Sequence, residues 1–171
     1  MHCVYSVPQG FACLYKNYCN SLLLGLPDSQ MHRLQKIHNT AARILTSTRK
    51  YEHITPVLYE LHWLPVKERI IFKTLILVHK CLFGCAPTYL KNLLTPLNHQ
   101  RDDLRSANAM TLKVPFTRSS HVKESTFAHA APALWNTLPL DLRNEENFGN
   151  FKANLKTFLF SKAYYNYMTF L

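Results

Sequence analysis

The chain has 171 residues, 47% of them hydrophobic, with 2 Trp, 9 Tyr and 10 Phe. This composition fits one compact domain with appendages and excludes wholesale disorder, because it supplies enough apolar surface for a core. The 20 Lys and Arg residues outnumber the 10 Asp and Glu residues, leaving a net charge of +10. Such a surplus favours polyanionic partners, nucleic acid first and acidic membranes second, although a merely soluble basic protein has the same composition.

Cysteine usage and hydropathy argue against secretion and membrane insertion. The five cysteines are odd in number and include no C-x-x-C pair, so disulfides are not implied and a reducing compartment fits. No apolar run approaches the roughly 18 residues that span a bilayer. The first 14 residues lack the basic start and apolar centre of a signal peptide. We therefore expect an intracellular protein, nuclear or cytoplasmic, with no membrane partner.

Residues 1–16 show no hydrophobic period and are expected to be poorly ordered. A helical pattern begins at Asp28, which is predicted to be the N-cap. The apolar stripe of this helix comprises Met31, Leu34, His38, Ala41, Ala42 and Leu45, widened by Ile37 and Ile44. On the other side, Arg33, Lys36, Thr40 and Arg43 fall within an arc of about 80°. Residues 31–50 contain five cations and no acid. This helix therefore combines an apolar face with a basic one.

Prolines mark the starts of the next helices. Thr55-Pro56 predicts an N-cap followed by proline at the first helical position, for a short helix ending near Leu61. Leu64-Pro65 opens the longest helix, about 66–83, whose wide apolar face predicts the centre of the core. Gly84 then ends it, and Pro87 starts a short helix over 88–94.

The remainder is predicted to be a connector followed by a returning C-terminal segment. Residues 95–126 form a mostly polar connector, within which only 110–114 alternates as a short strand of a β pair would. Helical turns are expected at 134–138 and 140–143, and a final helix over 148–162, where Phe and Leu recur at helical spacing. The fold class is mainly α: a helical core over 17–94, the connector, and residues 127–171, whose last helix packs back on the core.

No group of residues forms a convincing catalytic or metal site. The Asp102-Asp103 pair lies between arginines without the apolar hairpin of a two-metal polymerase site, so surface charge pairing fits better. His79, Cys81 and Cys85 lack a fourth zinc ligand. There is no glycine-rich phosphate loop, and no histidine pairs with Ser, Cys or a carboxylate at motif spacing, although distant residues can still meet in a fold. We expect no enzyme activity, no metal and no cofactor.

The cations are the candidate functional residues. They are Arg33, Lys36, Arg43, Arg49 and Lys50 on and after the first helix, and Arg69, Lys73 and Lys80 on the longest helix. Lysine and arginine heads contact phosphates without reading sequence, so such binding would be salt-sensitive and weakly specific. A solvated helix surface explains the same pattern equally well. The C-terminal phenylalanines could stack on bases, but their helical spacing is more typical of a core.

Several ordered phrases carry a resemblance to a known family. They are, in chain order, residues 18–27 (YCNSLLLGLP), 34–46 (LQKIHNTAARILT), 53–58 (HITPVL), 61–66 (LHWLPV), 86–90 (APTYL), 131–139 (APALWNTLP) and 151–160 (FKANLKTFLF). Together they resemble the region downstream of the catalytic palm in reverse transcriptases of non-LTR (LINE-type) retrotransposons, nearest to the jockey-like group and its vertebrate relatives. The resemblance covers about residues 17–162, and residues 1–16 depart from the pattern.

This resemblance implies the end of a polymerase thumb and a C-terminal region, without the palm aspartates or the endonuclease of the parent RNA-directed DNA polymerase. It transfers no catalytic residue, and it places the basic helix near template and primer. The expected function is non-specific RNA or DNA binding or a scaffold role in such a transposable element. The alternatives are a protein-interaction module that supports the upstream polymerase core, and a pseudogene product without function.

Overall fold

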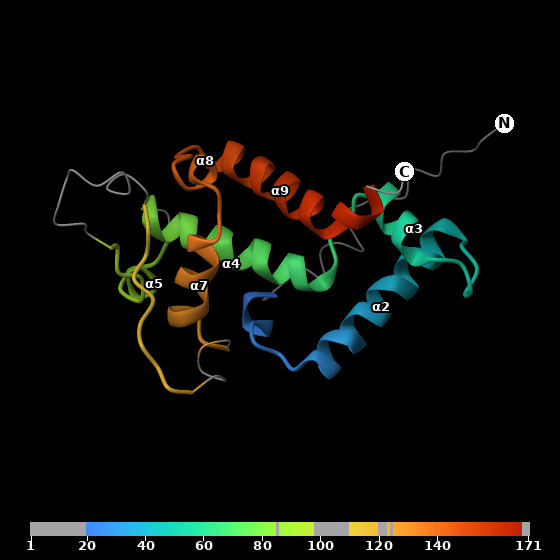
Figure 1. The fold of residues 1–171 in the computed structure, drawn as a ribbon, viewed down its shortest axis with the longest axis horizontal. Coiled ribbons are helices and arrows are strands. Elements are labelled where there is room, and N and C mark those ends of the chain that lie inside the picture. Colours follow the sequence, from blue (N-terminus) through green and yellow to red (C-terminus); the bar gives the residue numbers. More distant parts are fainter. Residues whose placement is uncertain (1–19, 85, 98–109, 120–122, 124, 169–171) are drawn as a thin grey trace.

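The computed structural model describes residues 20–84, 86–97, 110–119, 123 and 125–168. It confirms the predicted mainly α fold. In chain order the elements are the 3-10 helix η1 (Asn20–Leu23) and the helices α2 (Asp28–Thr46), α3 (Ile54–Glu60), α4 (Val66–Leu82), α5 (Thr88–Lys91), α7 (Phe127–Asn136), α8 (Leu140–Arg143) and α9 (Phe148–Met168) (Figure 1). The expected start at 1–16, the Asp102-Asp103 pair, Cys85 and residues 98–109 of the connector lie outside the described residues.

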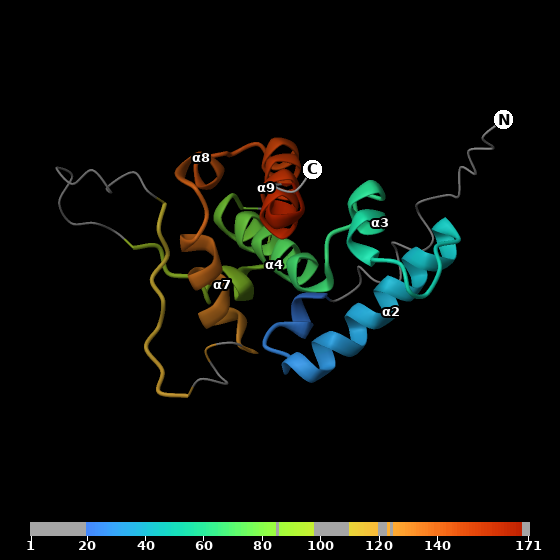
Figure 2. The same cartoon turned by 45° about the vertical axis from the view of Figure 1, so that its right-hand side comes forward.

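The centre of the molecule is the antiparallel pair of α4 and α9 (Figures 1 and 2). The pairing is visible in the contacts at its two ends: His79 of α4 stacks on Phe151 of α9, and Tyr164 of α9 reaches Trp63 just before α4. Helix α7 crosses α4 and adds Trp135, which is fully buried. The main hydrophobic core therefore mixes residues from both halves of the chain.

A second, smaller core lies where α2 and α3 meet the end of α9. Its buried members are Ala42, Val57, Leu58 and Tyr164. Helix α9 reaches it by continuing to Met168, so the predicted end near Lys162 was wrong. The early part of α9 buries Phe151, Leu155 and Leu159 against α4, whereas its late part buries a different side against α3. The predicted apolar stripe followed one side of the helix, so it did not include the last turns, which bury a different side. The predicted length of the helix was therefore too short.

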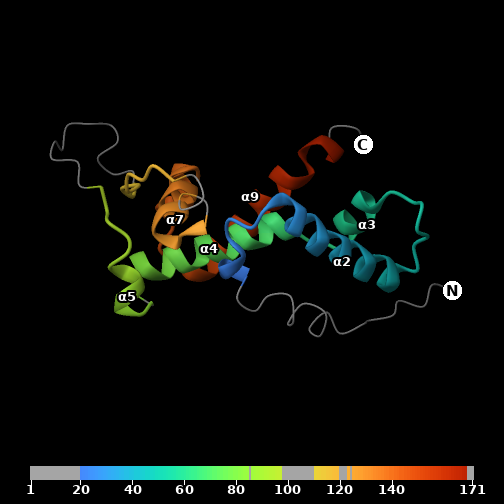
Figure 3. The same ribbon diagram turned by 90° about the horizontal axis from the view of Figure 1, so that it is seen from below.

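Part of the apolar face that the sequence predicted to be buried on α2 is exposed in the structure. Helix α2 packs against α3 and α4 through the side that carries His38 and Ala42 (Figure 3). Ile37 and Ile44 remain 59% and 74% exposed, because no described element covers that side. Their assignment to the buried stripe was wrong. Periodicity identified a wide apolar arc, but the neighbouring helices cover only part of it.

The predicted proline boundaries are largely confirmed. Pro65 and Pro87 each occupy the position before the first residue of a helix, with ψ 158° and 146°, where proline has no helical hydrogen bond to lose. Pro139, for which no helix start was predicted, has the same position before α8. Thr55 is not an N-cap, because α3 already begins at Ile54. The start of α4 is completed from α2, since the Gln35 side-chain oxygen accepts a hydrogen bond from the Val66 amide at 2.8 Å.

Helix α7 is longer than the turn expected at 134–138, and its end fastens the connector. The Asn136 amide group donates to the Leu112 carbonyl oxygen at 2.8 Å and accepts from the Leu112 amide at 3.0 Å. Trp135 Nε1 donates to the Met110 carbonyl oxygen at 2.8 Å. On its other side, Leu112 forms an isolated antiparallel bridge with Pro96. Among the described residues the predicted short β pair is thus a single bridge, flanked by hydrogen bonds from the Leu97 amide to the Thr111 oxygen and from the Lys113 amide to the Thr95 oxygen.

We predict that Asn136→Ala lowers the free energy of unfolding by about 1–3 kcal/mol, because it leaves the backbone N–H and C=O of buried Leu112 without partners. Urea denaturation followed by Trp fluorescence measures this. The control is Asn154→Ala on the exposed side of α9, which should be neutral or slightly stabilising. Equal stabilities for the two variants would contradict the assigned role of Asn136.

Candidate nucleic-acid interface

The structure places the eight predicted cations on α2, on the loop after it and on α4, and some are exposed while others are partly buried. Arg33 and Lys36 of α2, and Arg49 and Lys50 in the loop after it, are exposed. Arg43, Arg69, Lys73 and Lys80 are partly buried. The α4 cations are also spread out, since Arg69 and Lys80 are eleven residues apart, about 16 Å along a helix. The eight residues therefore do not form one equivalent patch.

Arg43 supports the chain turn that follows α2. Its guanidinium donates to the carbonyl oxygens of Arg49 and Glu52, the latter at 2.7 Å. Ser47, at the end of the helix, adopts a left-handed conformation with φ 53°, so the chain reverses direction there. A guanidinium with several donors suits two carbonyl oxygens at once. Arg43 thus has a structural role, and its charge is held at the turn.

Arg69 takes part in the joint between α3, α4 and α9. Its guanidinium lies over the Trp63 ring, 5.6 Å from the centroid. The Tyr164 hydroxyl donates to the Trp63 carbonyl oxygen at 2.5 Å. Burial, and after it the negative charge of Glu68, raises the pKa of Tyr164 to about 12, with Arg69 acting in the opposite direction. The hydroxyl is therefore a stable hydrogen-bond donor at this joint at neutral pH.

Lys80 lies at the other end of α4, beside an aromatic cluster. Its ammonium is 5.1 Å from the centroid of the Phe148 ring. The neighbouring His79 stacks on Phe151 with ring centroids 4.2 Å apart, and its Nε2 lies 2.9 Å from the Glu145 carbonyl oxygen. Burial lowers the pKa of His79, an effect that its hydrogen bond to the Glu145 backbone and the Glu145 charge partly oppose. This end of α4 is part of the core.

The exposed cations also include a group that the sequence reading did not select. Helix α9 exposes Lys152, Lys156 and Lys162. No acidic residue occurs within Phe148–Met168. The sequence indicated this basic group by a run of 21 residues without an acid. The apolar spacing of the same residues, however, predicted a core helix. The candidate interface consists of Arg33, Lys36 and Lys50 on the α2 side and these three lysines on α9.

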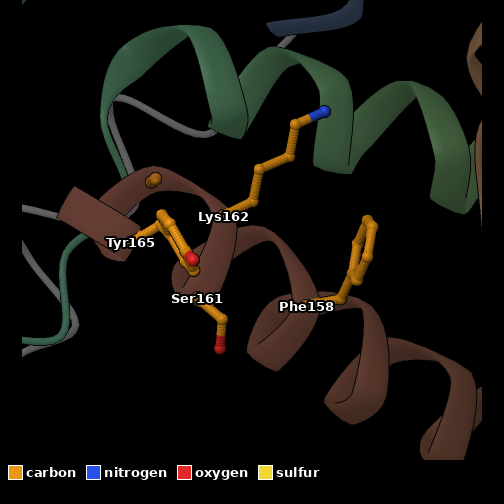
Figure 4. A pocket seen from close by; sticks show the side chains of 5 residues that line it. Phe158, Ser161, Lys162 and Tyr165 are labelled. Atoms are coloured by element: carbon orange, nitrogen blue, oxygen red, sulfur yellow. The ribbon is translucent and has the colours of Figure 1, made fainter. Parts of the chain in front are cut away.

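The described residues also line two hollows. One, of about 480 Å³, is on α9 and is lined by Phe158, Ser161, Lys162, Ala163 and Tyr165 (Figure 4). The other, of about 490 Å³, lies between η1, α2, α4 and α7, with Lys67 and Lys123 among mainly apolar lining residues. Neither hollow contains a nucleophile paired with a base.

No metal-binding group of three or more His, Cys, Asp or Glu residues occurs in the described part of the chain. Cys81 is buried, and burial raises the pKa of its thiol, with Lys91 acting in the opposite direction. A thiol in that state is a poor nucleophile and a poor ligand. None of the helices within the described ranges is both long and apolar enough to cross a bilayer.

Comparison of the chain with family models, with curated protein sequences and with solved structures found no match in any of the three.

We predict that the chain loses stability as the pH falls below about 6.5, because the unfolded chain protonates His79 at its ordinary pKa while the folded chain resists protonation. One proton bound only by the unfolded state gives a slope of about 1.4 kcal/mol per pH unit. Urea denaturation at several pH values between 5.5 and 7.5 measures the slope.

His79→Gln removes the titrating ring, so its slope should be shallower than that of the unsubstituted chain, whatever its absolute stability. His53→Gln is the matched control substitution, at an exposed position just before α3. If His79→Gln and His53→Gln gave the same slope, the assignment to His79 would be wrong.

Proposed function

We propose that this chain is a non-enzymatic nucleic-acid-binding region of the non-LTR retrotransposon reverse-transcriptase type, corresponding to the end of the thumb and the C-terminal region. It binds RNA or DNA through the phosphate backbone, with little dependence on sequence, and leaves polymerase chemistry to an upstream core. The proposal assigns no catalytic residue, metal or cofactor to this chain.

The observation that carries the proposal is the presence of exposed cations on α2 and on α9. Arg33 and Lys36 are exposed on a helix with no acid between Gln30 and Thr46, and α9 exposes three lysines without any acid. Surfaces of one charge attract a polyanion and contact its phosphates with mobile side chains.

The resemblance adds a second line of support. Its two tryptophan phrases, 61–66 and 131–139, coincide with structural joints: Trp63 lies at the junction of α3, α4 and α9, and Trp135 and Asn136 hold Met110 and Leu112. Residues of this kind are tied to a particular fold. The resemblance in these phrases therefore supports a shared architecture. The function that we propose is taken from the parent family.

The test is a salt series of binding to a generic RNA hairpin. We predict that Arg33→Gln with Lys36→Gln lowers the magnitude of the slope of log K against log salt by about 1–2, because two phosphate contacts are lost. Arg43 is left unchanged, since its substitution would disturb the turn after α2. Fluorescence anisotropy of a labelled hairpin gives K at each salt concentration.

The matched control is Lys113→Gln with Arg118→Gln, which removes the same net charge from exposed positions of the connector. If the two double variants bind alike, the site is not on α2. If the unsubstituted chain does not bind the hairpin at low salt, the proposed function is overturned.

A protein-interaction module that supports a polymerase core is the second candidate function. It is favoured by Ile37 and Ile44, which are largely exposed and lie about 10 Å apart on the uncovered side of α2. Exposed aliphatic side chains of this size at regular spacing are typical of a surface that packs against another helix or sheet.

For this candidate we predict that Ile37→Ala with Ile44→Ala leaves the free energy of unfolding unchanged or slightly raised, because both residues are exposed and alanine favours helix. The same pair should weaken co-purification with a non-LTR reverse-transcriptase core supplied as a separate chain. The control pair, Leu22→Ala with Leu140→Ala, removes exposed leucines elsewhere. Equal recovery of the core by both pairs would count against this face.

A further inference from the structure

Tyr165 differs from the other tyrosines of its run in pointing to solvent. Tyr164 is 3% exposed and Tyr167 is half-buried, because both pack against α3. Successive residues of a helix are rotated by 100°, so a residue next to Tyr164 lies on a different side. Tyr165 is 70% exposed there, and a large aromatic ring is thereby placed on the outer surface of α9.

The ring borders the hollow of about 480 Å³ on α9, together with Phe158, Ser161, Lys162 and Ala163 (Figure 4). Phe158–Lys162 and Ser161–Tyr165 are two i, i+4 pairs, so each pair lies on neighbouring turns of one face. In Figure 4, Phe158 and Lys162 project from one side of the helix toward α4 and Ser161 projects from the other, with the Tyr165 ring beside it.

The side chains that line the hollow differ in packing and chemistry. Phe158 packs against the main core, so this wall of the hollow is anchored. Lys162 is exposed and carries a positive charge, and Ser161 offers a hydroxyl. The hollow thus presents aromatic surface, a cation and a neutral hydrogen-bonding group on a helix without acidic residues.

We propose that this hollow binds an unpaired base of single-stranded nucleic acid, stacked on the Tyr165 ring, with the Lys162 ammonium near the adjoining phosphate. This inference rests on the proposed function and gives it a preferred ligand: single-stranded RNA or DNA. A base in a duplex is already stacked between its neighbours and cannot cover the Tyr165 ring, whereas every unpaired base has an accessible face. An aromatic ring beside a lysine suits a base and its phosphate better than it suits an aliphatic protein surface.

The experiment compares binding of three labelled probes, a short oligouridine, a short oligothymidine and a blunt RNA duplex, by fluorescence anisotropy. Stacking on one aromatic side chain is worth about 1–3 kcal/mol, so Tyr165→Ala should weaken binding of both single strands roughly 5- to 140-fold. Duplex binding should stay unchanged. Tyr165→Phe keeps the ring and should bind the single strands like the unsubstituted chain.

The matched control is Tyr89→Ala, because Tyr89 is 67% exposed on α5, at the opposite end of the molecule from the end of α9 (Figure 1). It should bind all three probes normally. Thermal denaturation of each variant checks that it is folded before its binding is compared.

The outcomes separate this inference from the proposed function. If the unsubstituted chain binds none of the probes at low salt, the proposed function is overturned and the stacking site with it. If the chain binds them but Tyr165→Ala matches Tyr89→Ala, only the stacking site is overturned. An equal loss on single strands and duplex would also overturn it, since stacking of an unpaired base cannot explain weaker duplex binding.

Discussion

Helix α9 holds together two hydrophobic cores that would otherwise have little in common. Its early residues Phe151, Leu155 and Leu159 fill the main core against α4, and Tyr164 closes the smaller core against α3, with Phe160 contacting both. Burying a large apolar side chain contributes about 1.5–3 kcal/mol, so these residues form a substantial part of the stability of both cores. The C-terminal helix is therefore as necessary to the residues before the connector as to those after it.

This constraint explains why several cations have structural roles. Arg69 lies over Trp63 where α9 meets the α3–α4 joint, and Lys80 lies beside Phe148 where α9 begins. Long basic side chains can pack their apolar stems on aromatic rings while keeping their charge near water. Positive charge in this chain consequently serves packing at the ends of the α4–α9 pair and remains exposed on the outer surfaces of α2 and α9.

The local features of the fold could be read from the sequence, whereas the features that depend on distant partners could not. Pro65 and Pro87 correctly predicted helix starts, since proline restricts the backbone directly around itself. The exposure of Ile37 and Ile44 depends on which helices reach α2. The two hydrogen bonds between Asn136 and Leu112 join residues 24 positions apart, and no local pattern encodes them.

The candidate site shows the same difference between features that are local in the sequence and features that depend on distant partners. Sequence identified Arg33 and Lys36 as residues of a basic face, and the structure leaves both exposed. It did not distinguish them from Arg43, because the turn that engages Arg43 forms only when the chain folds back toward α3. Tyr165 was hidden in an aromatic run whose other members are partly or fully buried, and its exposure follows from the change of buried face along α9.

Residues that hold the fold and residues proposed to bind nucleic acid are therefore different sets. Trp63, Trp135 and Asn136, from the phrases that carry the family resemblance, lie at joints between elements. Arg33, Lys36 and Tyr165 lie on outer surfaces, where substitution changes the ligand-facing chemistry with little effect on packing. A chain could thus keep its tryptophan phrases, and with them its architecture, while the proposed nucleic-acid binding is changed independently by substitutions on α2 and α9.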